Sequence, residues 1–396
     1  MGAVQRRERL PVNPRVLRWA RNRAGKSLEQ AARSAGVTPE VLAAWEQDPA
    51  ERTPTVRQAR MLAESYRCAF LEFFLPAPPE IAEPILIPDF RLYRGGQPPA
   101  ATRELIDIQA WAEMQRTNAL DLLAELAERP PEVPDAIFVT TESDVEAASA
   151  RARAILTFPL AEQVDLPKQE RENLVALLRR RIESLGILTL RRADLHKVRV
   201  RGFCLAEFPL PVIVFGSEAP AAQCFTLAHE FAHVLIRQSA ISGSIPREGG
   251  SPTARQTEEW CNRFAGAFLL PHEAIAQVIP RPKVPANNFS DEILRKLAEH
   301  FGVSGHAMLI RLVHLSYVRA EYYWDVKRPE FDAADEEYKR FARSKYYGSR
   351  YRAALGDLYT SLVLEAWSAG RITNHHAAEY MGIKNLAHLN AIRDNF

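Results

Sequence analysis

The stretch FTLAHEFAHVLI, residues Phe225–Ile236, places His229, Glu230 and His233 in an otherwise apolar segment. On a helix, the spacing i and i+4 puts both histidines on one face, one turn apart. Two imidazoles in that arrangement can bind Zn²⁺ together at about 2.0–2.2 Å. Glu230 follows the first histidine, as the general base does in the HExxH motif. The segment therefore predicts a metal centre with a catalytic Glu230. The alternative is a buried helix whose histidines only pack.

A catalytic zinc site needs a third protein ligand and keeps one coordination position open. The segment TEEWCNRFAGAFLLP, which begins at Thr257, offers Glu258 and Glu259. Its residues Trp260 and Phe264 recur at helical spacing and indicate a buried face. The spacing leaves both glutamates as possible third ligands. We expect about one zinc ion per chain, with another divalent metal as the alternative.

Three short runs before the HExxH segment are typical of β-strands. ILTL, VRVRGFCLA and PVIVFG, at residues 187–190, 198–206 and 211–216, contain many β-branched residues, and turn residues follow them. VRVRGFCLA is either a sheet edge open to an extended peptide or an internal strand, and the sequence leaves both interpretations open. Helical periodicity dominates elsewhere, so the second part of the chain is predicted to be α+β.

Short helices with tight turns are predicted for residues 15–75. Ser27 and Gln30 form a capping box, and Pro39 stands at the first position of the next helix, after Thr38. Two short helices joined by SAGVT have the spacing of a helix-turn-helix. The N-terminal region is therefore predicted to be an all-α helix-turn-helix domain.

Charge is distributed unevenly along the chain. Residues 1–75 hold 13 Lys and Arg against 8 Asp and Glu, a net charge of +5, whereas the rest holds 38 against 41, a net charge of −3. The second helix of the motif has no Arg, Lys, Asn or Gln before Gln47, although base readout usually needs those donors. We therefore expect contacts with the DNA backbone, from Arg15, Arg18, Arg21 and Arg33. The alternative is a protein-docking domain that selects the substrate.

The four cysteines, Cys68, Cys204, Cys224 and Cys261, are scattered without a close pair. This favours reduced thiols over a disulfide framework. The chain has no run of 18 apolar residues, and its first residues contain no apolar signal segment. We expect a cytoplasmic protein without a membrane partner.

The residues also resemble a known family. GFCLAEFPLPVIVFGSEAPAAQCFTLAHEFAHVLI, followed by EEWCNRFAGAFLLP, is similar to the ImmA/IrrE-type zinc metallopeptidases, often preceded by an XRE-type helix-turn-helix. The resemblance implies that Glu258 is the third ligand, as in a gluzincin-like metalloendopeptidase. Asn262, one turn after Glu258, is then expected to orient that carboxylate; the alternative is an ordinary surface amide. The family includes proteases that cut a DNA-binding repressor.

These observations predict a multidomain, mainly α protein with an α+β zincin-like catalytic domain. The expected function is a zinc-dependent endopeptidase of narrow specificity, which cleaves a repressor-like or antitoxin-like regulator to switch on a stress or mobile-element response. The competing function is a non-proteolytic DNA-binding transcriptional regulator that uses the same fold as a metal or ligand sensor. The predicted parts are an XRE-type domain at 1–75, a Pro-rich linker at 76–99, a metallopeptidase domain with a helical lead-in at 100–328 (core 170–320) and a C-terminal helical domain at 329–396.

Overall fold

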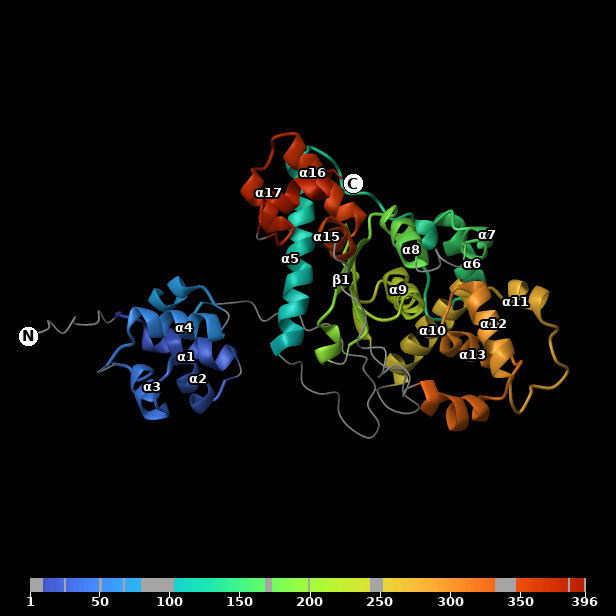
Figure 1. The fold of residues 1–396 in the computed structure, drawn as a ribbon, viewed down its shortest axis with the longest axis horizontal. Coiled ribbons are helices and arrows are strands. Elements are labelled where there is room, and N and C mark those ends of the chain that lie inside the picture. The colour runs from blue at the N-terminus through green and yellow to red at the C-terminus, as the bar shows by residue number, and fades with distance from the viewer. Residues whose placement is uncertain are drawn as a thin grey trace, which may run out of the picture. The chain divides into compact units, whose positions relative to one another are not determined.

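In this computed structural model the chain divides into two compact units, Met1–Ile85 and Leu86–Phe396. The structure describes residues 10–24, 26–49, 52–66, 68–79, 103–167, 173–198, 200–242, 252–331, 347–383 and 385–394. The predicted linker 76–99 lies largely outside these residues. Figure 1 shows the helices of the first unit in blue, and those of the second unit around a small sheet.

The first unit is all-helical. Its elements are α1 (Pro14–Arg23), α2 (Leu28–Ala35), α3 (Pro39–Trp45), α4 (Val56–Tyr66) and the 3-10 helix η1 (Phe70–Phe74). The predicted capping box is present, because Ser27 Oγ accepts a hydrogen bond from Gln30 N and Gln30 Oε1 accepts one from Ser27 N. Gly36 ends α2 in the left-handed conformation that glycine adopts without strain. The helix-turn-helix is therefore α2, the turn and α3.

The second unit is built on a four-stranded mixed sheet in the order β1-β3-β2-β4. The strands are β1 (Leu188–Arg192), β2 (Gly202–Leu205), β3 (Val212–Gly216) and β4 (Ala240–Ser242). β1 runs parallel to β3, while β2 is antiparallel to both β3 and β4. VRVRGFCLA therefore contains an internal strand. The edge strands are β1 and β4.

Helices cover both faces of the sheet (Figure 1). Val212 and Val214 of β3 join one apolar core, and Ile213 and Phe215 join the other, as the two-residue period of a strand requires. Every residue of β2 and β3 is buried. Such doubly covered strands form continuous apolar runs, which explains the sequence PVIVFG.

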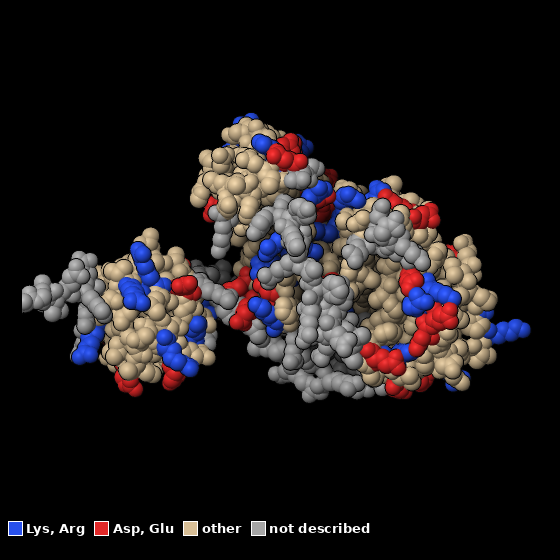
Figure 2. Space-filling view, viewed as in Figure 1, with Lys and Arg blue, Asp and Glu red and all other residues tan. Residues whose placement is uncertain are grey.

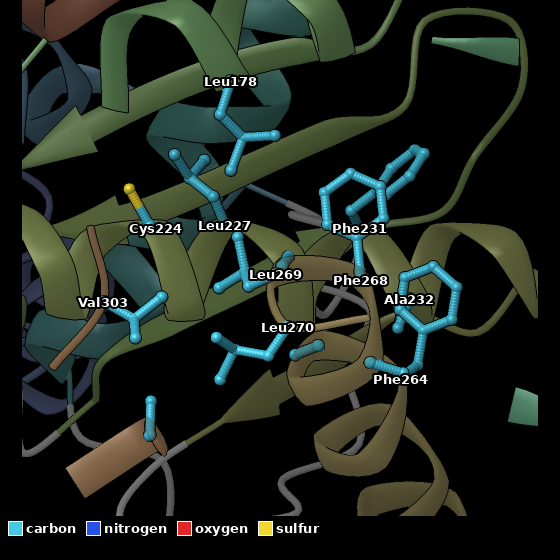
Figure 3. Close-up of a cluster of buried hydrophobic side chains, with 14 of the residues drawn as sticks. Leu178, Cys224, Leu227, Phe231, Ala232, Phe264, Phe268, Leu269, Leu270 and Val303 are labelled. Carbon is cyan, nitrogen blue, oxygen red and sulfur yellow. The ribbon is translucent and has the colours of Figure 1, made fainter. Parts of the chain in front are cut away.

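One core lies under α9 (Pro220–Leu235) and α10 (Pro252–Leu269). Figure 3 shows Phe231 of α9 beside Phe264 and Phe268 of α10. The ring centroid of Phe231 lies 6.4 Å from that of Phe264 and 6.2 Å from that of Phe268, with edge-to-face geometry in both pairs. This packing fixes the two helices against each other. Both candidate metal-binding segments lie on them.

The other core joins α5 (Arg103–Glu125) to the C-terminal helices α15 (Tyr347–Leu355), α16 (Asp357–Ser368), α17 (Asn374–Tyr380) and α18 (Ala387–Arg393). Buried Glu183 accepts hydrogen bonds from the backbone N–H groups of Asp357 and Leu358, and so caps α16. The helices between residues 347 and 394, which the sequence predicted to form a separate helical domain, thus share this core with α5 and the sheet.

The remaining elements lie mainly around α9 and α10. They are η2 (Asp135–Ile137), α6 (Val145–Ile155), α7 (Leu160–Val164), α8 (Leu174–Glu183), η4 (Leu195–Val198), α11 (His272–Val278), α12 (Asp291–Phe301), α13 (Gly305–His314) and the π-helix η5 (Tyr322–Lys327). The predicted fold class, multidomain and mainly α with an α+β second part, is confirmed. In the part of the chain that the structure describes, no helix combines the length and apolar character needed to cross a membrane.

Candidate metal centre

α9 is a buried helix that carries ionisable groups. Pro220 stands at its N-terminus, where the missing N–H needs no partner. From Leu227 to Leu235 every residue is buried, which is typical of a helix that is apolar on all sides. His229 is 5% exposed, and Glu230 and His233 are fully buried. Ionisable side chains at such depth require partners, because burial without them is unfavourable.

α10 brings Glu258 to the two histidines. His229 Nε2 lies 3.4 Å from Glu258 Oε2, and His233 Nε2 lies 3.1 Å from Glu258 Oε1. The two Nε2 atoms are 3.2 Å apart. A tetrahedral centre bonded at 2.0–2.1 Å has ligand atoms about 3.3–3.4 Å apart. These three separations therefore fit a divalent ion of zinc's size and ligand preference.

The electrostatics of the three groups also fit a cation. Burial alone would raise the pKa of Glu258, but His229 and His233 outweigh it and hold that pKa at about 2. Burial opposes protonation of His229, yet Glu258 raises its pKa above the usual value. Burial lowers the pKa of His233, which favours its neutral form. An ionised carboxylate and imidazole nitrogens are the donor set that Zn²⁺ prefers.

The structure separates the two acidic candidates on α10. Glu258 is 8% exposed and contacts both histidines, whereas Glu259 is exposed. The half-buried Asn262 forms a side-chain hydrogen bond that contributes to the raised pKa of His229. Asn262 thus contacts a histidine of the site, and its orientation of the Glu258 carboxylate stays a prediction. In either position it would help orient a ligand.

Glu230 lies against the backbone of β2. A Cβ atom on Gly202 would lie 2.7 Å from Glu230 Oε1 and 2.8 Å from Thr226 Cγ2, closer than real Cβ contacts. Only glycine therefore lets the carboxylate lie over this strand without a shift. Gly202 was not among the residues predicted from the sequence. A glycine inside a strand was the available signal, because it often marks a close approach to the backbone.

Two buried cysteines lie near the site. Burial raises the pKa of Cys204 and Cys261 well above the usual thiol value, and the carboxylates of Glu230 and Glu258 raise it further. Among the described residues, the group whose ligand atoms converge is His229, His233 and Glu258.

The arginines predicted to contact DNA have different environments in the first unit. Arg15 is 72% exposed and pairs with Asp48 at 2.6 Å. Arg18 is exposed and donates a hydrogen bond to the carbonyl of Glu46, and exposed Arg33 donates one to the carbonyl of Glu29. Figure 2 shows Lys and Arg separated by uncharged surface on the visible face of this unit.

Arg21 faces the interior of the first unit. Its Nε and Nη2 donate to both oxygens of Glu46, at 2.8 and 2.9 Å. The Glu46 side chain is 3% exposed, and the hydrogen bond to it raises the pKa of Arg21. The guanidinium is thus engaged in a mostly buried ion pair, and a phosphate would have to compete with that carboxylate.

Residues 182–313 match the IrrE N-terminal-like domain, a peptidase family, and residues 17–73 match the helix-turn-helix family. The chain thus has one region similar to a helix-turn-helix and a second region similar to an IrrE-type peptidase domain. The resemblance found in the sequence is therefore confirmed. The IrrE-type region extends from the end of α8 through α13 and contains all four strands, Glu230 and the three converging side chains. No curated protein and no solved structure matches the chain.

Proposed function

We propose that the protein is a zinc-dependent endopeptidase of narrow specificity that cleaves a DNA-binding regulator, of repressor or antitoxin type, in the cytoplasm. The observation that carries this proposal is the 3.1–3.4 Å spacing of the three ligand atoms, with Glu230 adjacent in sequence to the ligand His229. The match to the IrrE-type peptidase family supports it independently. The cleaved regulator would release its DNA, and this would switch on a stress or mobile-element response.

Each side chain of the centre has a distinct role in this proposal. His229, His233 and Glu258 would hold the metal, and Asn262 would fix the ring of His229. Bound Zn²⁺ supplies Lewis-acid polarisation of the scissile carbonyl. Glu230 takes a proton from the water that attacks that carbonyl and passes it to the leaving nitrogen. Peptide and water thus become a carboxylate and an amine, while the Gly202 backbone keeps Glu230 in place.

The helix-turn-helix supports DNA as a second partner. α3 offers Glu40 and no basic side chain, so base readout from this helix lacks its usual donors. We propose that exposed arginines, Arg15, Arg18 and Arg33, contact phosphates and locate the enzyme near its substrate on DNA.

The decisive variant is Glu230→Gln, which keeps size and shape but removes the base. Candidate regulators are co-expressed with the wild type or the variant, and their fragments are identified by mass spectrometry. We expect cleavage to fall by about 10²–10⁴-fold while bound zinc stays at the wild-type level. Glu259→Gln is the matched control, because Glu259 is an exposed glutamate next to the ligand candidate Glu258. This variant should cleave normally. Undiminished cleavage by Glu230→Gln would contradict the proposed mechanism.

A second function, metal or ligand sensing without proteolysis, is favoured by one observation. Glu230 is fully buried, so the base is enclosed in the structure described here. A sensor needs the metal but not the proton transfer. Its transcriptional response would therefore persist in Glu230→Gln and disappear in a variant that cannot bind zinc.

A further inference from the structure

A groove of about 610 Å³ runs along the outer face of α6, outside the metal centre. Alanines of α6 line it, together with Phe158, Pro159 and Pro271. Ser149 contributes a hydroxyl-bearing side chain, and Arg153 is the basic side chain of the lining. A mostly apolar concavity with few polar groups is the usual form of a small-molecule site.

Arg153 is a buried cation without an ion-paired acid, although the carboxylate of Glu162 raises its pKa against the larger opposing effect of burial. It is 8% exposed, and no carboxylate of the described residues lies within ion-pairing distance of it. Its Nη1 donates to Gln163 Oε1 at 3.0 Å and to the carbonyl of Phe268 at 2.7 Å. Its Nη2 is buried and has no hydrogen-bond partner among the described residues. Arginines this deeply buried are usually paired with an acid.

The groups around Arg153 compensate only part of its charge. The carbonyl of Phe268 belongs to the last turn of α10, where a cation interacts favourably with the helix dipole. The guanidinium also lies 4.2 Å from the ring centroid of Phe158. Burial lowers the pKa of Arg153 to about 10, so the group remains charged at neutral pH. A capping role explains Nη1 but leaves Nη2 unexplained.

The rim of the groove restricts the charge of a ligand. Glu146 and Glu273 lie at this rim; Glu146 pairs with Arg311 at 2.7 Å, whereas Glu273 is 70% exposed. A polyanion such as phosphate would meet repulsion there, while a single carboxylate close to Arg153 would meet less. We propose that the groove binds a small organic monocarboxylate, whose carboxylate accepts hydrogen bonds from Arg153 and whose apolar body lies against Pro159 and Pro271.

Calorimetric titration of the full chain with four probes tests this site. The probes are benzoate, its neutral analogue benzamide, acetate and inorganic phosphate. We expect benzamide to bind about tenfold or more weakly than benzoate, because it lacks the charge-assisted hydrogen bond. Acetate should also bind more weakly, because each lost buried carbon removes up to about fourfold in affinity. Equal binding of benzoate and benzamide, or tighter binding of phosphate, would overturn the proposal.

Four variants connect the binding to this groove. Arg153→Met should abolish benzoate binding, whereas Arg151→Met, on the exposed side of the same helix, should not. Should Arg153→Met fail to fold, Ala150→Phe fills the groove at an exposed position and should block benzoate while Arg153 remains. Glu273→Gln removes a negative charge from the rim and should strengthen binding. Wild-type affinity in Ala150→Phe, or weaker binding in Glu273→Gln, would refute the site.

Discussion

α9 and α1 both carry the ionisable residues to which the sequence directs attention, but they present them to different surroundings. On α9, His229 and His233 face the interior and meet Glu258 of α10 at 3.4 and 3.1 Å. On α1, Arg15 and Arg18 face outward, where Arg15 pairs with Asp48 and Arg18 donates a hydrogen bond to a backbone carbonyl. Buried groups are held in one geometry by packing, whereas surface cations contribute individually and weakly. Substitutions of the buried groups on α9 should therefore have large effects on metal binding, whereas substitutions of single exposed arginines should have small effects on DNA binding.

The largest effect is expected at a buried metal ligand. His233→Ala removes one of three converging donors and should eliminate bound zinc, measured by elemental analysis of the purified protein. His272→Ala is the matched control, because this histidine is 48% exposed and lies outside the centre. Full zinc content in His233→Ala would remove the basis for a metal centre on α9.

Two adjacent glutamates on α10, one buried and one exposed, should differ in their effect on zinc affinity. Glu258→Gln removes an ionised ligand and should weaken zinc binding by more than about a hundredfold, beyond the usual effect of changing an outer contact. Glu259→Gln changes an exposed side chain and should leave the affinity unchanged. Competition with a chelator of known affinity measures both. Loss of zinc in Glu259→Gln alone would show that the helix presents the other residue to the histidines.

Arg21 is the exception on α1, because it belongs to the interior. Arg21→Ala leaves buried Glu46 without its partner and should destabilise the first unit by about 3 kcal/mol. Arg33→Ala, at an exposed position, should change stability by less than about 0.5 kcal/mol. Urea unfolding followed by circular dichroism would report the difference. Similar stability of the two variants would place Arg21 among the surface cations after all.

Two glycine-to-alanine substitutions should change stability in opposite directions, because an added Cβ would meet close atoms at one position and normal van der Waals contacts at the other. Gly202→Ala places a Cβ 2.7 Å from Glu230 Oε1 and should destabilise the protein by about 1–3 kcal/mol while displacing that carboxylate. Gly266→Ala, in the interior of α10, places its Cβ 3.6 Å from Arg311 and should stabilise by about 0.5–1 kcal/mol. Thermal unfolding gives both signs. A stabilising Gly202→Ala would show that Glu230 does not depend on this glycine.

The smallest effect is expected at the exposed arginines. Arg18→Ala should weaken DNA binding by a similar factor for all sequences and reduce the salt dependence of the binding constant by about one ion. Fluorescence anisotropy at several salt concentrations measures this slope. Strong discrimination between sequences that survives the substitution would contradict binding through the backbone alone. Absence of binding at low salt would favour the protein-docking alternative.

Local patterns account for the parts of the fold that were predicted correctly. The HExxH spacing needs only the 3.6-residue period of a helix to bring His229 and His233 together. The capping box at Ser27 and Gln30 likewise depends on residues three apart. The strands were recognisable because their β-branched runs end at turn residues. In each case, the interacting groups are close in the chain.

By itself, the sequence determined the helix-turn-helix, the HExxH helix, the presence of a small sheet and the two acidic candidates for the third ligand. Only the tertiary structure decided that β2 is internal and that Gly202 meets Glu230. It also turned Glu258 inward and Glu259 outward, paired Arg21 with Glu46, and packed the C-terminal helices against α5 and the sheet. These contacts join residues far apart in the chain or depend on how a helix rotates against its neighbours. They follow from the packing of whole elements, which local propensity does not specify.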